Sequence, residues 1–406
     1  MNADIGQSRR AMFVVMGAAC LLLFLSFGTR ATFGLFLPPV SADLGWGREV
    51  FALAIAIQNI VVGAAQPFVS AYADRYGTGR TVVIGGLTYA AGLWMMANAS
   101  NPADAYLGLG LLVGLGLSGT SFAIVFAAVG RVTPERHRSF ALGATGSIGS
   151  VGQFAMVPLG QGFLDAYGWS TVLLILSAAI LVSLALAGVL RGRPEEQASA
   201  QSLGEALREA RDHNGYRLLT GGFFVCGFHV AYVGTHFPAY VTDKGLPAEY
   251  GAWALGLVGL FNVIGSFVAG YLGGRFSKRR ILSYLYAARA LLFTAFVLLP
   301  TTEVTVLVFG ATMGLLWLST VPVTSALVAQ IFGARYMGTL FAIVFFSHQM
   351  GSFLGAWLGG YVFDLTGSYD MVWWIAVALG VMSAALHWPI DERPVGRLRP
   401  AAAIPK

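Results

Sequence analysis

Long apolar stretches without charge constrain this chain more than any other feature. Ten stretches of 20 or more residues contain no Asp, Glu, Lys or Arg, and two more contain a single arginine each. A helix needs about 20 apolar residues to cross a hydrocarbon core, and only a helix satisfies its own backbone hydrogen bonds there. The sequence therefore predicts twelve spans: 11–38, 50–73, 81–103, 105–130, 139–164, 166–190, 218–242, 250–274, 281–302, 304–334, 336–363 and 371–390.

The composition supports an all-α membrane protein. Only 11% of the 406 residues are charged and the mean hydropathy is +0.70, whereas soluble domains carry about 25% charged residues. The lipid bilayer is thus an expected partner, and the formal charge of +6 does not indicate nucleic-acid binding. Both cysteines, Cys20 and Cys226, lie in apolar runs, which excludes a disulfide framework.

The positions of the basic residues predict the orientation. With a cytoplasmic amino terminus, 21 of the 25 Lys and Arg residues fall on the cytoplasmic side, Arg48 and Lys244 fall outside, and Arg30 and Arg289 lie within the membrane. Cytoplasmic loops of membrane proteins are enriched in Lys and Arg. We therefore expect a multi-pass protein of the inner (plasma) membrane with both termini in the cytoplasm.

A weak repeat of about 200 residues divides the chain. Pro38 and Asp43 match Pro238 and Asp243, and with a shift of one residue Asp165 matches Asp364. We expect two pseudo-symmetric six-helix bundles, 1–190 and 218–406, joined by a cytoplasmic linker, 191–217. Parallel repeats place a substrate site near the midplane between the bundles and suggest alternating access.

The loop after the second span carries a family resemblance. Ser70-Ala71-Tyr72-Ala73-Asp74-Arg75-Tyr76-Gly77-Thr78-Gly79-Arg80 resembles the signature loop of the major facilitator superfamily, and 270–280 looks like its degenerate second copy. The resemblance implies a secondary transporter. Basic and acidic residues at these loops can form contacts between the halves in one access state and break them in the other. The expected gating residues are Asp74, Arg75, Arg80 and Arg275.

The first span resembles one branch of that superfamily. Arg30, followed by Phe33, Phe36 and Pro38-Pro39, is similar to the oxalate/formate antiporter and monocarboxylate transporter branch, in which a basic residue of span 1 contributes to carboxylate binding. The branch also has an arginine in span 8, four residues after an acidic or amide residue. Asn262 fits the first of these positions, but Ser266 occupies the second.

Arg30 is the most informative residue of the membrane interior. It precedes Pro38 by eight residues, roughly 12 Å along a helix, which is too deep for its charge to reach the surface easily. Intramembrane charges usually face a cavity or a partner, and no Asp or Glu lies at matching depth. A negatively charged ligand would fill that role. Arg289, in the peripheral span 9, is expected to have a structural role with Tyr284, Tyr286 or backbone carbonyls.

Span 7 is the repeat counterpart of span 1 and contains several polar residues on one helical face. His229, Tyr232 and His236 recur at spacings of three or four, and the histidines, with His348, are candidate proton carriers. The full set of expected substrate-binding residues is Arg30, Phe33, His229, Tyr232, His236, Asn262, Ser319, Thr320, His348 and Gln349.

These features favour transport of a small organic anion, a monocarboxylate above all, coupled to protons or to anion exchange. An efflux pump for amphipathic compounds is the alternative, and Cys226 and the histidines leave copper transport as a third reading. Gly110 replaces the span-4 arginine of proton-coupled drug exporters, which argues against multidrug export. No nucleotide-binding loop or nucleophile constellation appears, so we expect no enzyme activity, cofactor or metal site, and a monomer.

Overall fold

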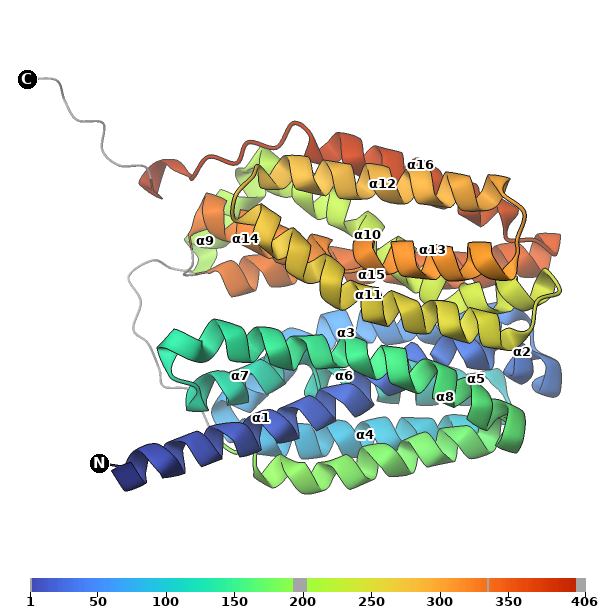
Figure 1. The fold of residues 1–406 in the computed structure, drawn as a ribbon, viewed down its shortest axis with the longest axis horizontal. Helices are drawn as coiled ribbons and strands as arrows, with labels where there is room; N and C mark the ends of the chain where they lie inside the picture. Colours follow the sequence, from blue (N-terminus) through green and yellow to red (C-terminus); the bar gives the residue numbers. More distant parts are fainter. Residues whose placement is uncertain (1, 193–202, 334–335, 399–406) are drawn as a thin grey trace, which may run out of the picture.

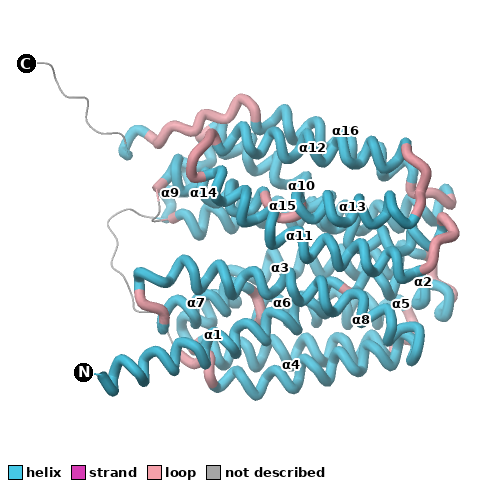
Figure 2. Tube along the Cα trace, in the orientation of Figure 1, coloured by secondary structure: helices cyan, strands magenta, loops and turns pink. Residues whose placement is uncertain are grey.

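The computed structural model describes residues 2–192, 203–333 and 336–398. Within these residues the chain is almost entirely helical, and Figure 2 shows most of the loops at the two ends of the molecule. The helices are α1 Asn2–Ala31, α2 Phe33–Leu44, α3 Arg48–Tyr76, α4 Thr78–Ala97, α5 Pro102–Ala105, a π-helix Tyr106–Leu112, α6 Val113–Gly119, α7 Phe122–Val132, α8 Glu135–Ser183, α9 Leu203–Asp212, α10 Asn214–Asp243, α11 Ala248–Gly273, α12 Lys278–Leu298, α13 Glu303–Leu316, α14 Thr320–Phe332, α15 Met337–Thr366 and α16 Asp370–His387, with short 3₁₀ turns at Leu184–Gly188 and Gly396–Leu398.

These helices make the twelve expected spans. Ten continuous segments of the described chain are long and apolar enough to cross a bilayer. One of them, Ala141–Gly188, contains two spans, because Gly168 has a φ of 75° and turns the chain within α8. The twelfth span is α4, whose 20 residues are long enough to cross. The predicted all-α architecture of two six-helix bundles is therefore confirmed.

Three spans are broken near their middle. The first changes from α1 to α2 at Thr32, whose hydroxyl donates to the carbonyl of Thr29 at 2.7 Å. The fourth is broken between α6 and α7, and the tenth between α13 and α14. The last two breaks occupy matching places in the two repeats, so the internal symmetry extends to the irregular parts of the helices.

Each bundle is held by its own helix pairs, and within the described residues three extensive helix pairs join the bundles. α1 and α4 pack on α8 in the first bundle, while α10 packs on α15 and α12 on α16 in the second. The joining pairs are α3 with α15, α8 with α11, and α2 with α10. At Gly34 a side chain would have no room, because an added Cβ would clash with the Gly234 carbonyl oxygen. Small residues permit such close packing in membranes.

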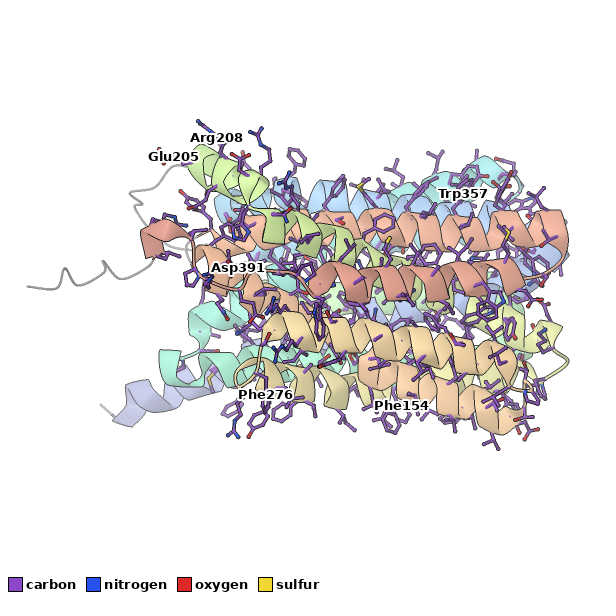
Figure 3. The ribbon with its side chains drawn as sticks, turned by 90° about the horizontal axis from the view of Figure 1, so that it is seen from above. Phe154, Glu205, Arg208, Phe276, Trp357 and Asp391 are labelled. Carbon is purple, nitrogen blue, oxygen red and sulfur yellow. The ribbon has the colours of Figure 1, made fainter. Side chains whose placement is uncertain are left out.

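The two ends of the molecule differ in what they carry. The start of α1, the turn Gly396–Leu398 and α9 lie at one end, which we call the termini end, and Figure 3 labels Glu205 and Arg208 of α9 there. The opposite end, which we call the far end, carries the loops before α3, α11 and α16. α9 belongs to the second bundle, since Glu209 pairs with Arg397 at 3.0 Å. Residues 193–202 of the expected linker lie outside the described chain.

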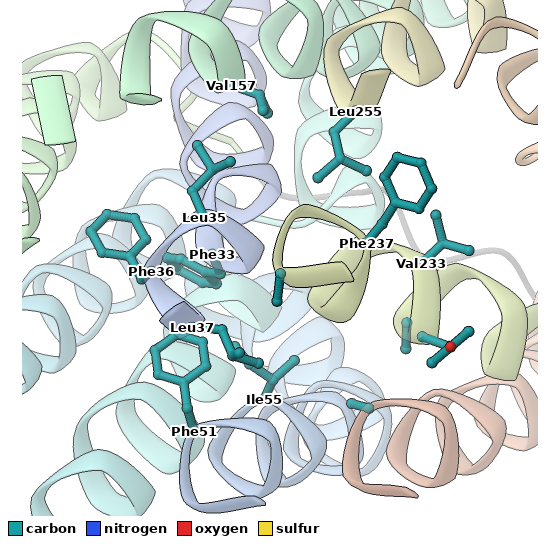
Figure 4. Packing of buried hydrophobic residues seen from close by; sticks show 14 of the residues in the cluster. Phe33, Leu35, Phe36, Leu37, Phe51, Ile55, Val157, Val233, Phe237 and Leu255 are labelled. Carbon is teal, nitrogen blue, oxygen red and sulfur yellow. The ribbon is translucent and has the colours of Figure 1, made fainter. Parts of the chain in front are cut away.

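An apolar cluster fills the space between the bundles toward the far end. Phe33, Leu35 and Leu37 of α2 meet side chains of α3, α8, α10 and α11 in this cluster (Figure 4). Phe33 is only 3% exposed and belongs to this packing. The cluster therefore separates the polar residues of the midplane from the far end.

Candidate functional site

Arg30 lies at the break of the first span. It is in the last turn of α1 and directs its Nη2 to the Oδ1 atom of Asn59 on α3, at 2.6 Å. The amide of Asn59 is fixed in turn, because its Nδ2 donates to the carbonyl of Ile55 at 2.9 Å. That second bond leaves Oδ1 as the atom presented to the guanidinium. Arg30 is thus oriented by a neutral side chain.

The charge of Arg30 has no counter-charge in the described chain. A guanidinium has five N–H donors, and Asn59 accepts from one of them. Among residues 2–192, 203–333 and 336–398, no other hydrogen bond and no salt bridge of Arg30 is present. The remaining donors can form a two-point contact with a carboxylate.

Span 4 packs closely against the helix that carries Asn59. The π-helix Tyr106–Leu112 widens the backbone there, and Gln58 donates from Nε2 to the carbonyl of Leu109 at 2.9 Å. π-helical turns are frequent at functional sites. An added Cβ at Gly110 would lie 3.0 Å from the Cγ2 atom of Ile57, so this position has no room for a long basic side chain.

Asn262 connects the break in span 10 to the opposite bundle. Its Oδ1 accepts from the backbone N–H of Leu318 at 2.9 Å and from the hydroxyl of Ser266 at 3.2 Å, while its Nδ2 donates to Ser150 of α8 at 2.8 Å. Ser319 lies in the same break and bonds to the carbonyl of Leu315. The structure therefore brings Asn262 and Ser319 together at the seam between the bundles.

Gln349 also lies at this seam, on the side of α15 that packs against α3. An added Cβ at Gly63 would lie 3.0 Å from the Cβ of Gln349, and Gly63 is one helical turn after Asn59. Gln349 is 1% exposed, and its Nε2 has no hydrogen-bond partner in the described chain. An unsatisfied buried donor is costly, so this amide N–H can donate to a ligand at the seam.

The expected residues of span 7 face the interior of the second bundle. His229 bonds through Nε2 to the carbonyl of Ala376 on α16 at 2.8 Å, and its ring packs against Phe293 of α12. The ring of Tyr232 lies 5.0 Å from that of Trp373 on α16. The structure brings these residues close to each other but does not place them with Arg30 and Asn59.

His348 and Thr320 form a second polar group at the junction of α10, α14 and α15. Thr320 lies 3.3 Å from the thiol of Cys226, and His348 is within 3.2 Å of Gln349 and 3.4 Å of Ser352. Through Gln349 this group reaches the seam. No group of three or more His, Cys, Asp and Glu side chains able to hold a metal is present in the described residues.

Arg289 has the structural surroundings that its peripheral span suggested. It is fully buried and donates to the carbonyls of Leu316 and Trp317 at the end of α13, with the Nε bond to Leu316 at 3.2 Å. A helix end leaves its last carbonyls without partners, and the partial negative charge there favours a cation. Arg289 therefore caps the broken tenth span.

A group of polar contacts closes the far end. Arg48 forms a two-point ion pair with Asp243, with Nη1 and Nη2 at 2.6 and 2.7 Å from the carboxylate oxygens, and Nη1 also donates to the hydroxyl of Tyr369 at 2.9 Å. Asp364 accepts from the backbone N–H groups of Arg48 and Glu49 at 2.9 and 2.8 Å. We call Arg48, Glu49, Asp243, Trp357, Asp364 and Tyr369 the far-end clasp.

Two further contacts complete the far-end clasp. Trp357, toward the far end in Figure 3, donates from Nε1 to Glu49 at 2.8 Å. Burial raises the pKa of the Tyr369 hydroxyl well above its usual range, although Arg48 opposes this, so the hydroxyl stays protonated. It accepts from Arg48 and can donate to Nδ1 of His236, 3.3 Å away, while Nε2 of His236 donates to the Ala356 carbonyl. His236 therefore supports the clasp.

The fold agrees with comparisons to known proteins. A family model of the Major Facilitator Superfamily matches residues 19–346. The chain belongs to this superfamily. It is 25% identical over 384 residues to the uncharacterized MFS-type transporter YcxA of Bacillus subtilis, covering 88% of this chain and 90% of that protein. It is 29% identical over 387 residues to monocarboxylate transporter 11 of Mus musculus, covering 88% and 82%.

Two solved transporter structures share the fold. A point mutant of the nucleoside transporter NupG superposes with a TM-score of 0.77 at 14% identity, covering 94% of this chain and 99% of that one. A D-xylose-proton symporter superposes with a TM-score of 0.71 at 15% identity, covering 93% and 97%. The recognition of the superfamily from its signature loop is confirmed by the family model that matches residues 19–346.

The signature loop of the superfamily lies at the termini end and makes no ion pair in the described chain. Asp74, Arg75, Arg80 and Arg275 are exposed. Arg75 and Arg275 lie over the rings of Tyr76 and Tyr271, at 5.3 and 4.4 Å. Figure 1 shows α7 and α14 apart at this end, whereas the far-end clasp joins the bundles at the other. This superfamily member is therefore held closed at its far end.

Proposed function

We propose that this superfamily transporter carries small organic anions of the monocarboxylate class. The observation that carries the proposal is the guanidinium of Arg30, which is held by the neutral Asn59 and has no carboxylate partner in the described residues. A charge inside the membrane is expensive without a partner. A substrate carboxylate would supply that partner and would accept two parallel N–H bonds from the guanidinium. The similarity to monocarboxylate transporter 11 supports the same substrate class.

The opposite wall of the proposed site comes from the second bundle. Gln349 offers an unpartnered amide donor, and Asn262 and Ser319 lie at the break of span 10. In this proposal the carboxylate binds Arg30, and the rest of the substrate contacts the seam near Gln349. Closure of the termini end, with residues 1–190 and 218–406 moving as units joined by 191–217, would then enclose the substrate.

The unpaired charge of Arg30 also favours anion exchange as the coupling mode. To return to its other access state without substrate, the transporter must pass through closed conformations. In these the charge of Arg30 is buried without a counter-ion. A bound anion neutralises that charge and lowers the barrier. Two of the three histidines expected as proton carriers bond away from the seam, with His229 held by Ala376 and His236 by Ala356. We therefore propose exchange of one anion for another.

A thermal-stability screen tests the substrate class. Purified protein is melted with a panel of monocarboxylates, their neutral amides, amphipathic cations and copper. Because only a ligand of the folded state raises the melting temperature, we expect stabilisation by carboxylates and none by the amides. Stabilisation by amphipathic cations alone would favour the efflux reading, and stabilisation by copper alone would favour metal transport.

We propose that the termini end faces the cytoplasm and that the far end lies outside the plasma membrane. The excess of Lys and Arg on the side of the termini supports this orientation. In a variant with Cys20 and Cys226 replaced by Ala, we expect Lys244→Cys to react with an impermeant thiol reagent applied to intact cells and Arg211→Cys to remain unlabelled. Both positions are exposed. The reverse labelling pattern would refute the orientation.

A further inference from the structure

A groove at the far end of the second bundle carries two opposite charges. It has a volume of about 580 Å³ and lies between the end of α10, the segment after α12 and the start of α16. Lys244 and Asp370 both line it, and the hydroxyls of Tyr240 and Thr301, 3.4 Å apart, lie in the same groove. None of these residues belongs to the proposed substrate site.

The two charges of the groove do not neutralise each other. The ammonium group of Lys244 lies 5.3 Å from the ring centroid of Tyr240 and forms no ion pair within the described chain. Asp370 begins α16, and its backbone N–H donates to the hydroxyl of Ser368 at 3.1 Å. Its carboxylate has no hydrogen-bond donor in the described residues. The groove therefore offers one cationic and one anionic contact to the same ligand.

The rim of the groove is apolar and faces outward. Leu298, at the end of α12, is 69% exposed, and Trp374, in the first turns of α16, is 46% exposed. Both helices are candidate membrane spans, and the groove lies where α12 ends and α16 begins. Tryptophan is enriched where a membrane meets water. The groove thus joins a polar interior to a surface that contacts the acyl-chain boundary of the leaflet at the far end.

We propose that this groove binds the headgroup of a zwitterionic phospholipid with a primary ammonium, the phosphatidylethanolamine class. Lys244 binds the phosphate, Asp370 accepts hydrogen bonds from the ammonium, and the acyl chains follow Leu298 and Trp374. A trimethylated choline headgroup has no N–H to donate to Asp370. A purely anionic headgroup has its phosphate for Lys244 but brings no cation to pair with the carboxylate of Asp370. The site is independent of the substrate that is transported.

Native mass spectrometry of the full-length protein in detergent tests this site. The protein is mixed with equal amounts of phosphatidylethanolamine, phosphatidylcholine and phosphatidylglycerol of identical acyl chains, and the retained lipids are counted. We expect about a tenfold preference of the wild type for phosphatidylethanolamine over phosphatidylcholine, the effect of one charge-assisted hydrogen bond. Asp370→Asn should remove this preference. Lys244→Gln should weaken the retention of phosphatidylethanolamine and of phosphatidylcholine.

Asp165→Asn is the matched control for loss of one far-end carboxylate. Asp165 is exposed in the first bundle and accepts from Gln161 at 2.8 Å, so this variant should keep the wild-type preference. All the substituted side chains are at the surface, and a melting curve of each variant verifies folding. Equal retention of the three lipids by the wild type, or an unchanged preference in Asp370→Asn, would overturn the proposal. Soluble phosphoethanolamine that displaces the lipid at equimolar concentration would also overturn it, in favour of a small zwitterion.

Discussion

We expect Arg30→Gln to abolish anion binding and to leave the protein folded. Glutamine keeps a donor toward Asn59 but removes the positive charge and the fork of donors that matches a carboxylate. The loss of two charge-assisted hydrogen bonds corresponds to about 3 kcal/mol or more, roughly a hundredfold in Kd. Arg30→Lys should retain a weakened fraction, because a point charge remains. Carboxylate titrations followed by the melting temperature measure both effects.

Asn59→Asp supplies the sharper comparison for the same site. Asn59 accepts from Arg30 at 2.6 Å, and a carboxylate at this position would keep that bond while neutralising the guanidinium from within the protein. The variant should lose anion binding as completely as Arg30→Gln, yet should melt at a temperature no lower than that of the wild type. If Asn59→Asp bound carboxylates with unchanged affinity, Arg30 would not be the anion-binding group.

His229→Gln completes the set of site variants. His229 bonds to Ala376 on α16 and is 0% exposed, so its loss should change stability and leave the Kd for carboxylates within about threefold of the wild-type value. A loss of affinity as large as that of Arg30→Gln would show that His229 belongs to the substrate site.

Arg48→Ala shifts the protein toward a conformation that is open at the far end. Arg48 makes two bonds to Asp243 and one to Tyr369 across the seam, with side-chain exposures of 15% for Arg48 and 31% for Asp243. Partly buried charged hydrogen bonds contribute about 1.5–3 kcal/mol, which changes the ratio of two conformations by roughly 10- to 100-fold. Electron–electron distance measurements between spin labels at Ala103 and Glu303 follow the separation of the bundles at this end.

Asp43→Asn is the control for the far-end clasp. Asp43 is the repeat counterpart of Asp243, but it accepts from Trp169 of its own bundle at 2.8 Å and does not cross the seam. This variant should leave the distance distribution unchanged, and exchanging the charges, with Arg48→Asp and Asp243→Arg together, should restore part of the closed population. An unchanged distribution in Arg48→Ala would show that the clasp does not hold the closed state.

Properties that repeat along the chain were predictable from the sequence. The twelve spans follow from charge-free length, and the two bundles follow from matches such as Asp43 with Asp243. Arg30 stood out because a single charge in an apolar span needs a partner. The position of Asn59 beside it could not be predicted, because the rotation of α3 about its axis depends on packing with α15 and α4.

The repeat argument did not predict the side-chain directions of span 7. Val230 matches Arg30 in the repeat, and His229 was expected near the same cavity. Adjacent residues of a helix point about 100° apart, so His229 turns toward α12 and α16. The far-end clasp was missed because Arg48 and Asp243 are 195 residues apart. The one available signal was that Arg48 and Lys244 are the two basic residues expected at the far end.

Equilibrium exchange in proteoliposomes tests the central claim most directly. Liposomes containing the purified protein are loaded with the monocarboxylate that stabilises it best, and uptake of the same labelled compound is followed. We predict rapid uptake of the labelled carboxylate. Excess unlabelled carboxylate outside the liposomes should inhibit this uptake, and its neutral amide should not. For Arg30→Gln and Asn59→Asp, uptake should not exceed that of liposomes without protein. Uptake by either variant at the wild-type rate, or equal competition by the amide, would contradict anion transport through Arg30.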